Sequence, residues 1–126
     1  MVPHAHVLVA DDDPQLLDAV AEALTTMGAD VIRATSGAEL IDQLANGPFD
    51  LVVTDVAMPW MSGLQAIRST HAAGLATSVI VMTALTDPRI PAQVQALGKH
   101  AVLLRKPFGL TELEAAASRL LSAKRS

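Results

Sequence analysis

The chain has 126 residues, which is the length of one domain with a buried core, and we expect a single domain over residues 1–126. Hydrophobic residues make up 51% of the chain and charged residues 17%, which excludes an intrinsically disordered protein. The net charge of −4, without a long basic run, argues against direct binding to nucleic acid. The absence of cysteine excludes disulfide and thiol chemistry.

The sequence shows no targeting or membrane-spanning segment. The N-terminus lacks the charged start and long apolar stretch of a signal peptide, and no apolar run approaches the roughly 18 residues of a membrane span. The four histidines have no metal-ligand spacing, so each is interpreted as a solvated or packed residue. We therefore expect a soluble cytoplasmic protein that does not associate with a membrane.

Strand and helix patterns alternate along the chain. Short apolar runs predict five strands, at His6–Ala10, Asp30–Ala34, Leu51–Thr54, Ser78–Thr83 and Ala101–Arg105. Helical spacing of apolar residues predicts helices at Pro14–Met27, Gly37–Asn46, Ser62–Ala73 and Leu110–Ala123, with a fifth, shorter helix before the last strand. This alternation predicts an α/β protein with a doubly wound parallel sheet and helices on both faces.

Local sequence patterns predict which residues of two helices face the core and how the last helix is capped. The second predicted helix is expected to turn Leu40, Ile41 and Leu44 toward the core. The last helix carries a predicted capping box formed by Thr111 and Glu114. Its apolar stripe consists of Leu113, Ala117, Leu120 and Leu121.

Two prolines disturb the fourth helix. A residue before a proline avoids the helical region, so Ile90, which precedes Pro91, is a poor helical residue. We therefore expect a short helix over about residues 91–97, after an extended loop over residues 84–90. The alternative is a start at Pro88, which places Pro91 in the first turn and removes an early backbone donor.

The run Asp11-Asp12-Asp13 directly follows the first predicted strand. Ligands of an open α/β sheet bind at the carboxyl ends of its strands, so these side chains lie where a site would form. Clustered carboxylates repel one another and favour a bound divalent cation, and all-oxygen ligation suits Mg2+. Helix capping by Asp13, with Pro14 in the first turn, explains the third aspartate but neither of the other two.

Three further strands deliver polar side chains to the same edge. Asp55 follows the third predicted strand, Thr83 ends the fourth and Lys106 follows the fifth. If the first and third strands are neighbours, this edge gathers two or three carboxylates, a hydroxyl and an ammonium group. Each residue alone has a purely structural explanation, but their coincidence at strand ends favours a functional site.

Four segments resemble the receiver domain of response regulators, the phosphoacceptor module of two-component signalling. They are VLVADDDP at 7–14, LVVTDVAMPWMSG at 51–63, VIVMTA at 79–84 and LLRKPF at 103–108, in the order found in the family. The resemblance covers nearly the whole chain. It implies a flavodoxin-like three-layer sandwich with five helices and a five-stranded sheet of order 2-1-3-4-5, in which the first and third strands are neighbours.

The resemblance implies the role of each acidic residue. Asp55 would be the phosphoacceptor, whose carboxylate attacks a phosphohistidine and forms an acyl phosphate. Mg2+ would be the cofactor, with Asp12 as a direct ligand and Asp11 as a ligand mainly through water. Asp55 and the backbone carbonyl of Ala57 would complete the metal ligands. Three aspartates and one lysine leave two excess negative charges, so phosphoryl transfer should require the metal.

The remaining site residues and the partners also follow from the resemblance. Thr83 would hydrogen-bond the phosphoryl group, Lys106 would pair with it, and the Lys106–Pro107 peptide would be cis. The partners would be a sensor histidine kinase or phosphotransfer protein and a downstream protein target, with a phosphorylation-dependent dimer as a further state. The chemistry would be self-phosphorylation and slow self-dephosphorylation at Asp55 rather than turnover of a substrate.

The chain departs from the family pattern at the position of the switching aromatic residue, which is Leu103 here. In the family this residue changes the surface formed by helix 4, strand 5 and helix 5, so we hypothesise an atypical output face. Ala57 and Leu85 flank the site and cannot orient a hydrolytic water through a side chain. This predicts a long-lived acyl phosphate.

Other functions remain open on the sequence alone. A degenerate receiver would act only as a protein-interaction module, but such proteins usually lose an acid, the threonine or the lysine, and this chain retains all of them. An Asp-x-Asp phosphatase needs a second aspartate where this chain has Ala57. A flavodoxin-like mononucleotide carrier needs a phosphate loop rich in Ser, Thr and Gly after the first strand, where this chain has aspartates. The chain ends just after its last predicted helix, so we expect a receiver without its own DNA-binding output. A stand-alone receiver, a phosphorelay intermediate and a fragment of a larger regulator or hybrid kinase all fit this expectation.

Overall fold

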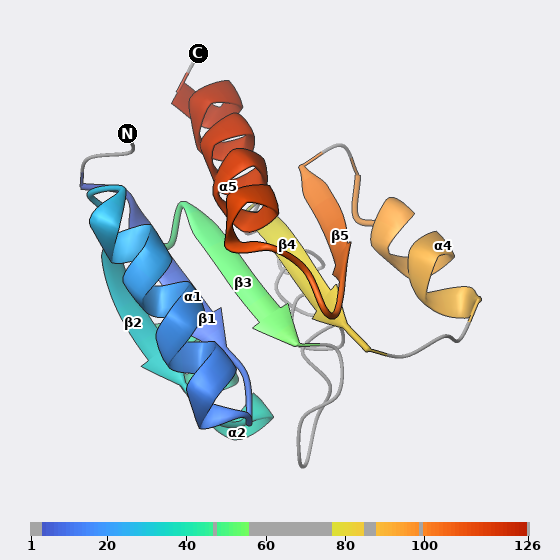
Figure 1. The fold of residues 1–126 in the computed structure, drawn as a ribbon, viewed down its shortest axis with the longest axis horizontal. Helices are drawn as coiled ribbons and strands as arrows, with labels where there is room; N and C mark the ends of the chain where they lie inside the picture. The colour runs from blue at the N-terminus through green and yellow to red at the C-terminus, as the bar shows by residue number, and fades with distance from the viewer. Residues whose placement is uncertain (1–3, 47, 56–76, 85–87, 99, 126) are drawn as a thin grey trace.

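A parallel five-stranded sheet forms the centre of the protein (Figure 1). The computed structural model describes residues 4–46, 48–55, 77–84, 88–98 and 100–125. The strands are β1 (His6–Ala10), β2 (Asp30–Ala34), β3 (Leu51–Asp55), β4 (Ser78–Thr83) and β5 (Ala101–Arg105), in the order β2-β1-β3-β4-β5. The expected fold class and strand order are confirmed, and β1 and β3 are neighbours along Val7–Ala10.

Apolar side chains on one face of the sheet pack against α1 (Pro14–Thr26) and α5 (Leu110–Arg125). Figure 1 shows these two helices side by side in front of the sheet. Successive residues of a strand point to opposite faces, so this face takes alternate residues of each strand. The cluster includes the predicted stripe of α5, all of it buried: Leu113, Ala117, Leu120 and Leu121.

The opposite face packs against α2 (Gly37–Ala45) and α4 (Arg89–Gln95). Leu40 is fully buried there and Leu44 is partly buried. The expectation that Ile41 also points inward is wrong, because its side chain is 37% exposed. Ile41 directly follows Leu40, and adjacent residues of a helix point in different directions. Because the buried stripe of this nine-residue helix at the edge of the sheet is narrow, it includes Leu40 but not Ile41.

The start of α4 differs from the sequence-based expectation. The helix begins at Arg89 rather than at Pro91, so Pro91 lies in its first turn. The first four N–H groups of a helix have no intrahelical partner, so a proline there removes no hydrogen bond. Ile90 and Val94 are both 4% exposed, so burial of Ile90 outweighs the local bias against helix before a proline.

The cap of α5 also differs from the prediction. The helix starts at Leu110, and the Glu112 carboxylate accepts a hydrogen bond from the Gly109 N–H at 3.3 Å. Thr111 therefore lies inside the first turn, and the predicted Thr111–Glu114 box is wrong. The reciprocal half of a capping box is formed instead by Gly109 and Glu112, two residues earlier.

The third predicted helix, over residues 62–73, lies outside the described residues. The strands on either side of it pair in parallel, with Leu51 opposite Ser78. Within the described part of the chain, no helix has the length and apolar character to cross a membrane.

Candidate functional site at the carboxyl edge of the sheet

Asp11 is held immediately beyond β1 by its own loop. Its backbone N–H donates to the Ala34 carbonyl at 3.1 Å, and its Oδ1 accepts from the Asp13 N–H at 2.9 Å. Asp13 in turn caps α1, since its Oδ1 accepts from the Gln15 N–H at 3.0 Å. The side chain of Asp11 is fully buried, whereas Asp12 is exposed. This loop therefore presents two adjacent carboxylates in different environments.

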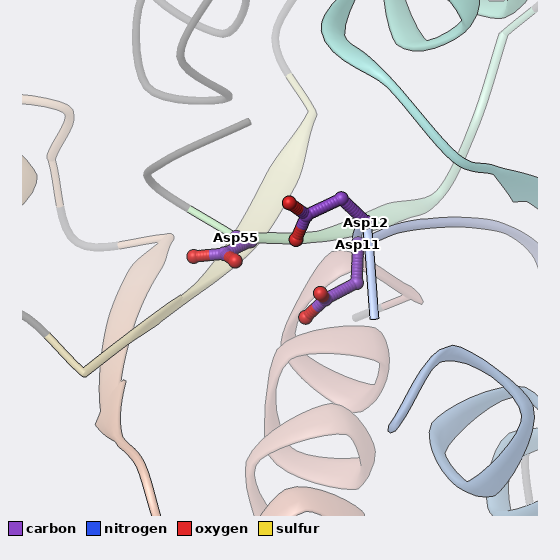
Figure 2. Close-up of side chains that lie close together, drawn as sticks. All are labelled: Asp11, Asp12 and Asp55. Atoms are coloured by element: carbon purple, nitrogen blue, oxygen red, sulfur yellow. The ribbon is translucent and has the colours of Figure 1, made fainter. Parts of the chain in front are cut away.

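Asp55 is the last residue of β3, one residue further than the strand was predicted to extend. It is 8% exposed and lies opposite Met82 of β4. Figure 2 shows its carboxylate close to those of Asp11 and Asp12. One carboxylate oxygen from each of the three residues lies within 4.8 Å of the others.

Lys106 reaches this cluster from the end of β5. Its Nζ donates to Asp11 Oδ2 at 3.0 Å and to Asp55 Oδ2 at 3.2 Å. Its backbone N–H donates to the Thr83 carbonyl at 2.7 Å, which joins the ends of β4 and β5. The Lys106–Pro107 peptide is cis, as the resemblance implied. The ammonium group is thus bound to two carboxylates that are 51 and 95 residues away in sequence.

Burial and charge shift the ionisation of this network. Burial raises the pKa of Asp11, against the lowering effect of the Asp13 N–H and of Lys106, and the neighbouring Asp55 charge raises it further. For Lys106, burial lowers the pKa, but the bonds and charges of Asp11 and Asp55 outweigh it and the pKa is raised. Lys106 therefore stays protonated at neutral pH, and the buried Asp11 carboxylate is destabilised by its surroundings.

The donor set fits a hard divalent cation. Three clustered carboxylates supply only oxygen ligands, which suit Mg2+, Ca2+ or Mn2+ rather than softer metals. Three negative charges against the single charge of Lys106 leave two in excess, which a divalent ion neutralises. The protein thus has an acidic cluster that could bind a metal.

The other predicted site residues are placed as follows. Thr83 is the last residue of β4, 1% exposed, and its strand neighbour in β5 is Arg105, directly before Lys106. The sheet therefore brings Asp11, Asp12, Asp55, Thr83 and Lys106 to one edge. Ala57, the fourth predicted contributor to the metal site, lies outside the described residues.

Sequence reasoning missed two features next to the site. Thr54 carries a fully buried hydroxyl that donates to the Asp55 carbonyl at 3.1 Å. The sequence feature that could have revealed it is the single hydroxyl residue within the apolar run of β3. The second feature is the start of α2, where Ser36 caps the helix and Glu39 accepts from the N–H and hydroxyl of Thr35. The Ser36-x-x-Glu39 spacing is the capping-box pattern.

A sequence model described as the response regulator receiver domain matches residues 7–118. The chain belongs to this family. A curated relative of this receiver domain is the transcriptional regulatory protein KdpE of Mycobacterium tuberculosis, 40% identical over 107 residues. That match covers 84% of this chain and 46% of KdpE. The chain spans about half the length of the curated relatives it matches.

Solved structures share the fold of this receiver domain. The chemotaxis response regulator CheY4 of Vibrio cholerae superimposes with a TM-score of 0.82 at 27% identity, over 93% of this chain and 98% of CheY4. The response regulator TrrA of Thermotoga maritima, solved in complex with Mg2+-BeF, gives a TM-score of 0.80 at 26% identity. That match covers 92% of this chain and 98% of TrrA. The chain is therefore a receiver domain of two-component response regulators in both sequence and fold.

Proposed function

We propose that this receiver domain accepts a phosphoryl group on Asp55 in a Mg2+-dependent reaction. The donor is a phosphohistidine on a sensor histidine kinase or phosphotransfer protein. The observation that carries the proposal is the bridging of Asp11 and Asp55 by the Lys106 ammonium within a cluster of three carboxylates. An interaction module without phosphorylation would have no need to retain this poorly neutralised arrangement.

In the proposed reaction, an Asp55 carboxylate oxygen attacks the phosphorus atom of the donor. A P–O bond to Asp55 forms as the bond between phosphorus and the histidine nitrogen breaks, and the electron pair of that bond returns to the nitrogen. Lys106 balances charge on the transferred group, and Thr83 supplies a hydroxyl to its oxygens. Because Lys106 already holds an oxygen of Asp55, the nucleophile is oriented before the donor arrives.

Asp11, Asp12 and Asp55 would hold Mg2+, together with the backbone carbonyl of Ala57. When bound, Mg2+ neutralises the excess negative charge and screens the incoming phosphoryl anion from the carboxylates. Support comes from the oxygen-only donor set of this chain, and TrrA is a relative solved with Mg2+-BeF. The acyl phosphate carries roughly −1.5 to −2 charges, so phosphorylation makes the site more negative by about one charge.

The signal would leave through the surface formed by α4, β5 and α5, toward a downstream protein target. Leu103, at the position of the family's switching aromatic residue, is partly buried against the cluster that includes Ile90 and Val94 of α4. A leucine has no hydroxyl or ring to exchange between the core and the surface. Movement of Thr83 would instead reach β5 through the bond from the Lys106 N–H to the Thr83 carbonyl.

Intact mass spectrometry after incubation with acetyl phosphate tests this function. We expect one added phosphoryl group that requires both Mg2+ and Asp55, and none on Asp55→Asn. Asp18→Asn is the matched control, because Asp18 is an exposed aspartate of α1 paired with Arg33 at 3.4 Å, and it should react like the wild-type protein. Mg2+ binding by wild-type protein without any adduct from acetyl phosphate or from a phosphorylated donor protein would contradict the proposal.

A further inference from the structure

Thr54 is a buried hydroxyl residue in an otherwise apolar layer of the sheet. It lies on β3 between Ala10 of β1 and Val81 of β4, which are both fully buried. Both neighbours belong to the apolar cluster on the α2 and α4 face. A hydroxyl without a partner in such a place costs free energy, so a valine of similar shape would be expected if packing alone mattered.

The hydroxyl of Thr54 is bonded to the backbone of the proposed nucleophile. Its Oγ1 donates to the carbonyl oxygen of Asp55 at 3.1 Å, and this bond is buried. The ring that the bond closes runs from the Thr54 side chain through the peptide bond and the Cα of Asp55 to its carbonyl. Both backbone dihedral angles of Asp55 lie within that ring, so the bond restricts the conformation from which the Asp55 side chain projects.

Asp55 needs such a restraint because it is the last residue of β3. Its side chain points to the opposite face of the strand from that of Thr54, because successive strand residues alternate. Thr54 therefore acts through the Asp55 backbone rather than through the carboxylate. A rotation of the Asp55 backbone would shift its Oδ2 away from Lys106, which lies 3.2 Å from it.

We propose that Thr54 is a positioning residue for phosphoryl acceptance, whose hydroxyl fixes the backbone of Asp55 so that its carboxylate meets the donor in line. This inference rests on the proposed function of Asp55. The hydroxyl makes no contribution to the charge of the site. Its loss should therefore slow the reaction without changing the requirement for Mg2+.

The test compares the rate of phosphoryl adduct formation in Thr54→Val and Thr54→Ser, over a range of acetyl phosphate concentrations at saturating Mg2+. Thr54→Val keeps the shape and loses the donor, and should lower the maximal rate about five- to tenfold, the value of one hydrogen bond. The half-saturating donor concentration should not change. Thr54→Ser keeps the hydroxyl and should react within about twofold of the wild-type rate.

Thr25→Val is the matched control, because the Thr25 hydroxyl donates to the Ala21 carbonyl within α1 at 2.8 Å, away from Asp55. It should react at the wild-type rate. If Thr54→Val does not fold, Thr54→Ser and Thr54→Ala, which both lose the methyl group, make the same comparison. Equal rates for wild type and Thr54→Val, or equal slowing in the serine and hydroxyl-free variants, would overturn this inference alone. No adduct on the wild-type protein would overturn the proposed function and the inference together.

Discussion

The two charged sides of the site are held in different ways. The acidic loop after β1 is fixed mainly by neighbours in sequence, since Asp13 binds Asp11 through its N–H and caps α1 through its carboxylate, with one further bond from the Asp11 N–H to the Ala34 carbonyl of β2. Lys106 is fixed by residues far away in sequence, through its bonds to Thr83, Asp11 and Asp55. The acidic side should therefore depend less on the rest of the fold than the ammonium, whose position depends on bonds to residues from three other strand ends.

Removal of the ammonium should produce the largest effect. Lys106→Met leaves Asp11 and Asp55 without their shared cation, and we expect a loss of about 2 kcal/mol in the free energy of unfolding without Mg2+. The rate of phosphoryl acceptance should fall about 100-fold. Urea unfolding and intact mass measure the two effects.

Arg33→Met provides the matched control for that change. Arg33 pairs with Asp18 at 3.4 Å on the surface, with side chains 47% and 67% exposed, so its loss should cost less than about 0.5 kcal/mol. Equal losses in the two variants would show that the long-range bonds of Lys106 contribute no more than an exposed ion pair.

Loss of the local cap should have a smaller effect. Asp13→Ala removes the carboxylate that accepts from the Gln15 N–H, and we expect a loss of about 1 kcal/mol in the free energy of unfolding. Asp13→Asn should restore most of it, because asparagine is an equally good cap. The bond from the residue-13 N–H to Asp11 is a backbone donation and persists in both variants. A tenfold slower phosphorylation of Asp13→Ala would contradict the view that the cap and the site are separable.

Neutralisation of the buried carboxylate should be mildly stabilising. Burial raises the pKa of Asp11, so the folded protein binds its proton more tightly than the unfolded chain does. This contribution to stability is present at low pH and is lost as the pH rises above the usual value of about 3.8. In the absence of Mg2+ at neutral pH, Asp11→Asn should therefore raise the free energy of unfolding by up to about 1 kcal/mol.

Thermal unfolding with and without Mg2+ checks this expectation. Wild-type protein should be stabilised by Mg2+, and Asp11→Asn should gain less from the metal because one ligand is neutral. Lower stability of the variant in metal-free buffer would mean that the bond from Lys106 to Asp11 outweighs the cost of burial.

The smallest effect is expected at Glu39, another locally held carboxylate. Its hydrogen bonds from the side chain and backbone of Thr35 lower its pKa below the usual 4.5. The folded state therefore gains stability above the pH at which the unfolded glutamate titrates, and loses it as the pH falls through the lowered pKa. Glu39→Gln should therefore lower the free energy of unfolding slightly at pH 7, leave it unchanged at low pH, and so weaken the acid-side decline in stability. Acid titration of unfolding, compared with Glu22→Gln in α1, measures the difference.

Much of the fold was predictable because its signals are local and repeated. Five short apolar runs and the turns between them predict the strands, and parallel connections restrict the topology to few choices. The exposed Ile41, the start of α4 and the cap of α5 were predicted wrongly. The start of α4 depended on the burial of Ile90, and the cap of α5 depended on the hydrogen bond between Gly109 and Glu112.

The sequence by itself determined the residue types at the strand ends, the local cap at Asp13 and the membership of the receiver family. The tertiary structure decided which oxygens lie within 4.8 Å of one another, that Lys106 binds both Asp11 and Asp55, and that the Thr54 hydroxyl meets the Asp55 carbonyl. The physical reason is the distance along the sequence over which each interaction acts. Capping and periodicity act over a few residues, whereas charges at the ends of β1, β3 and β5 interact only after the sheet has formed.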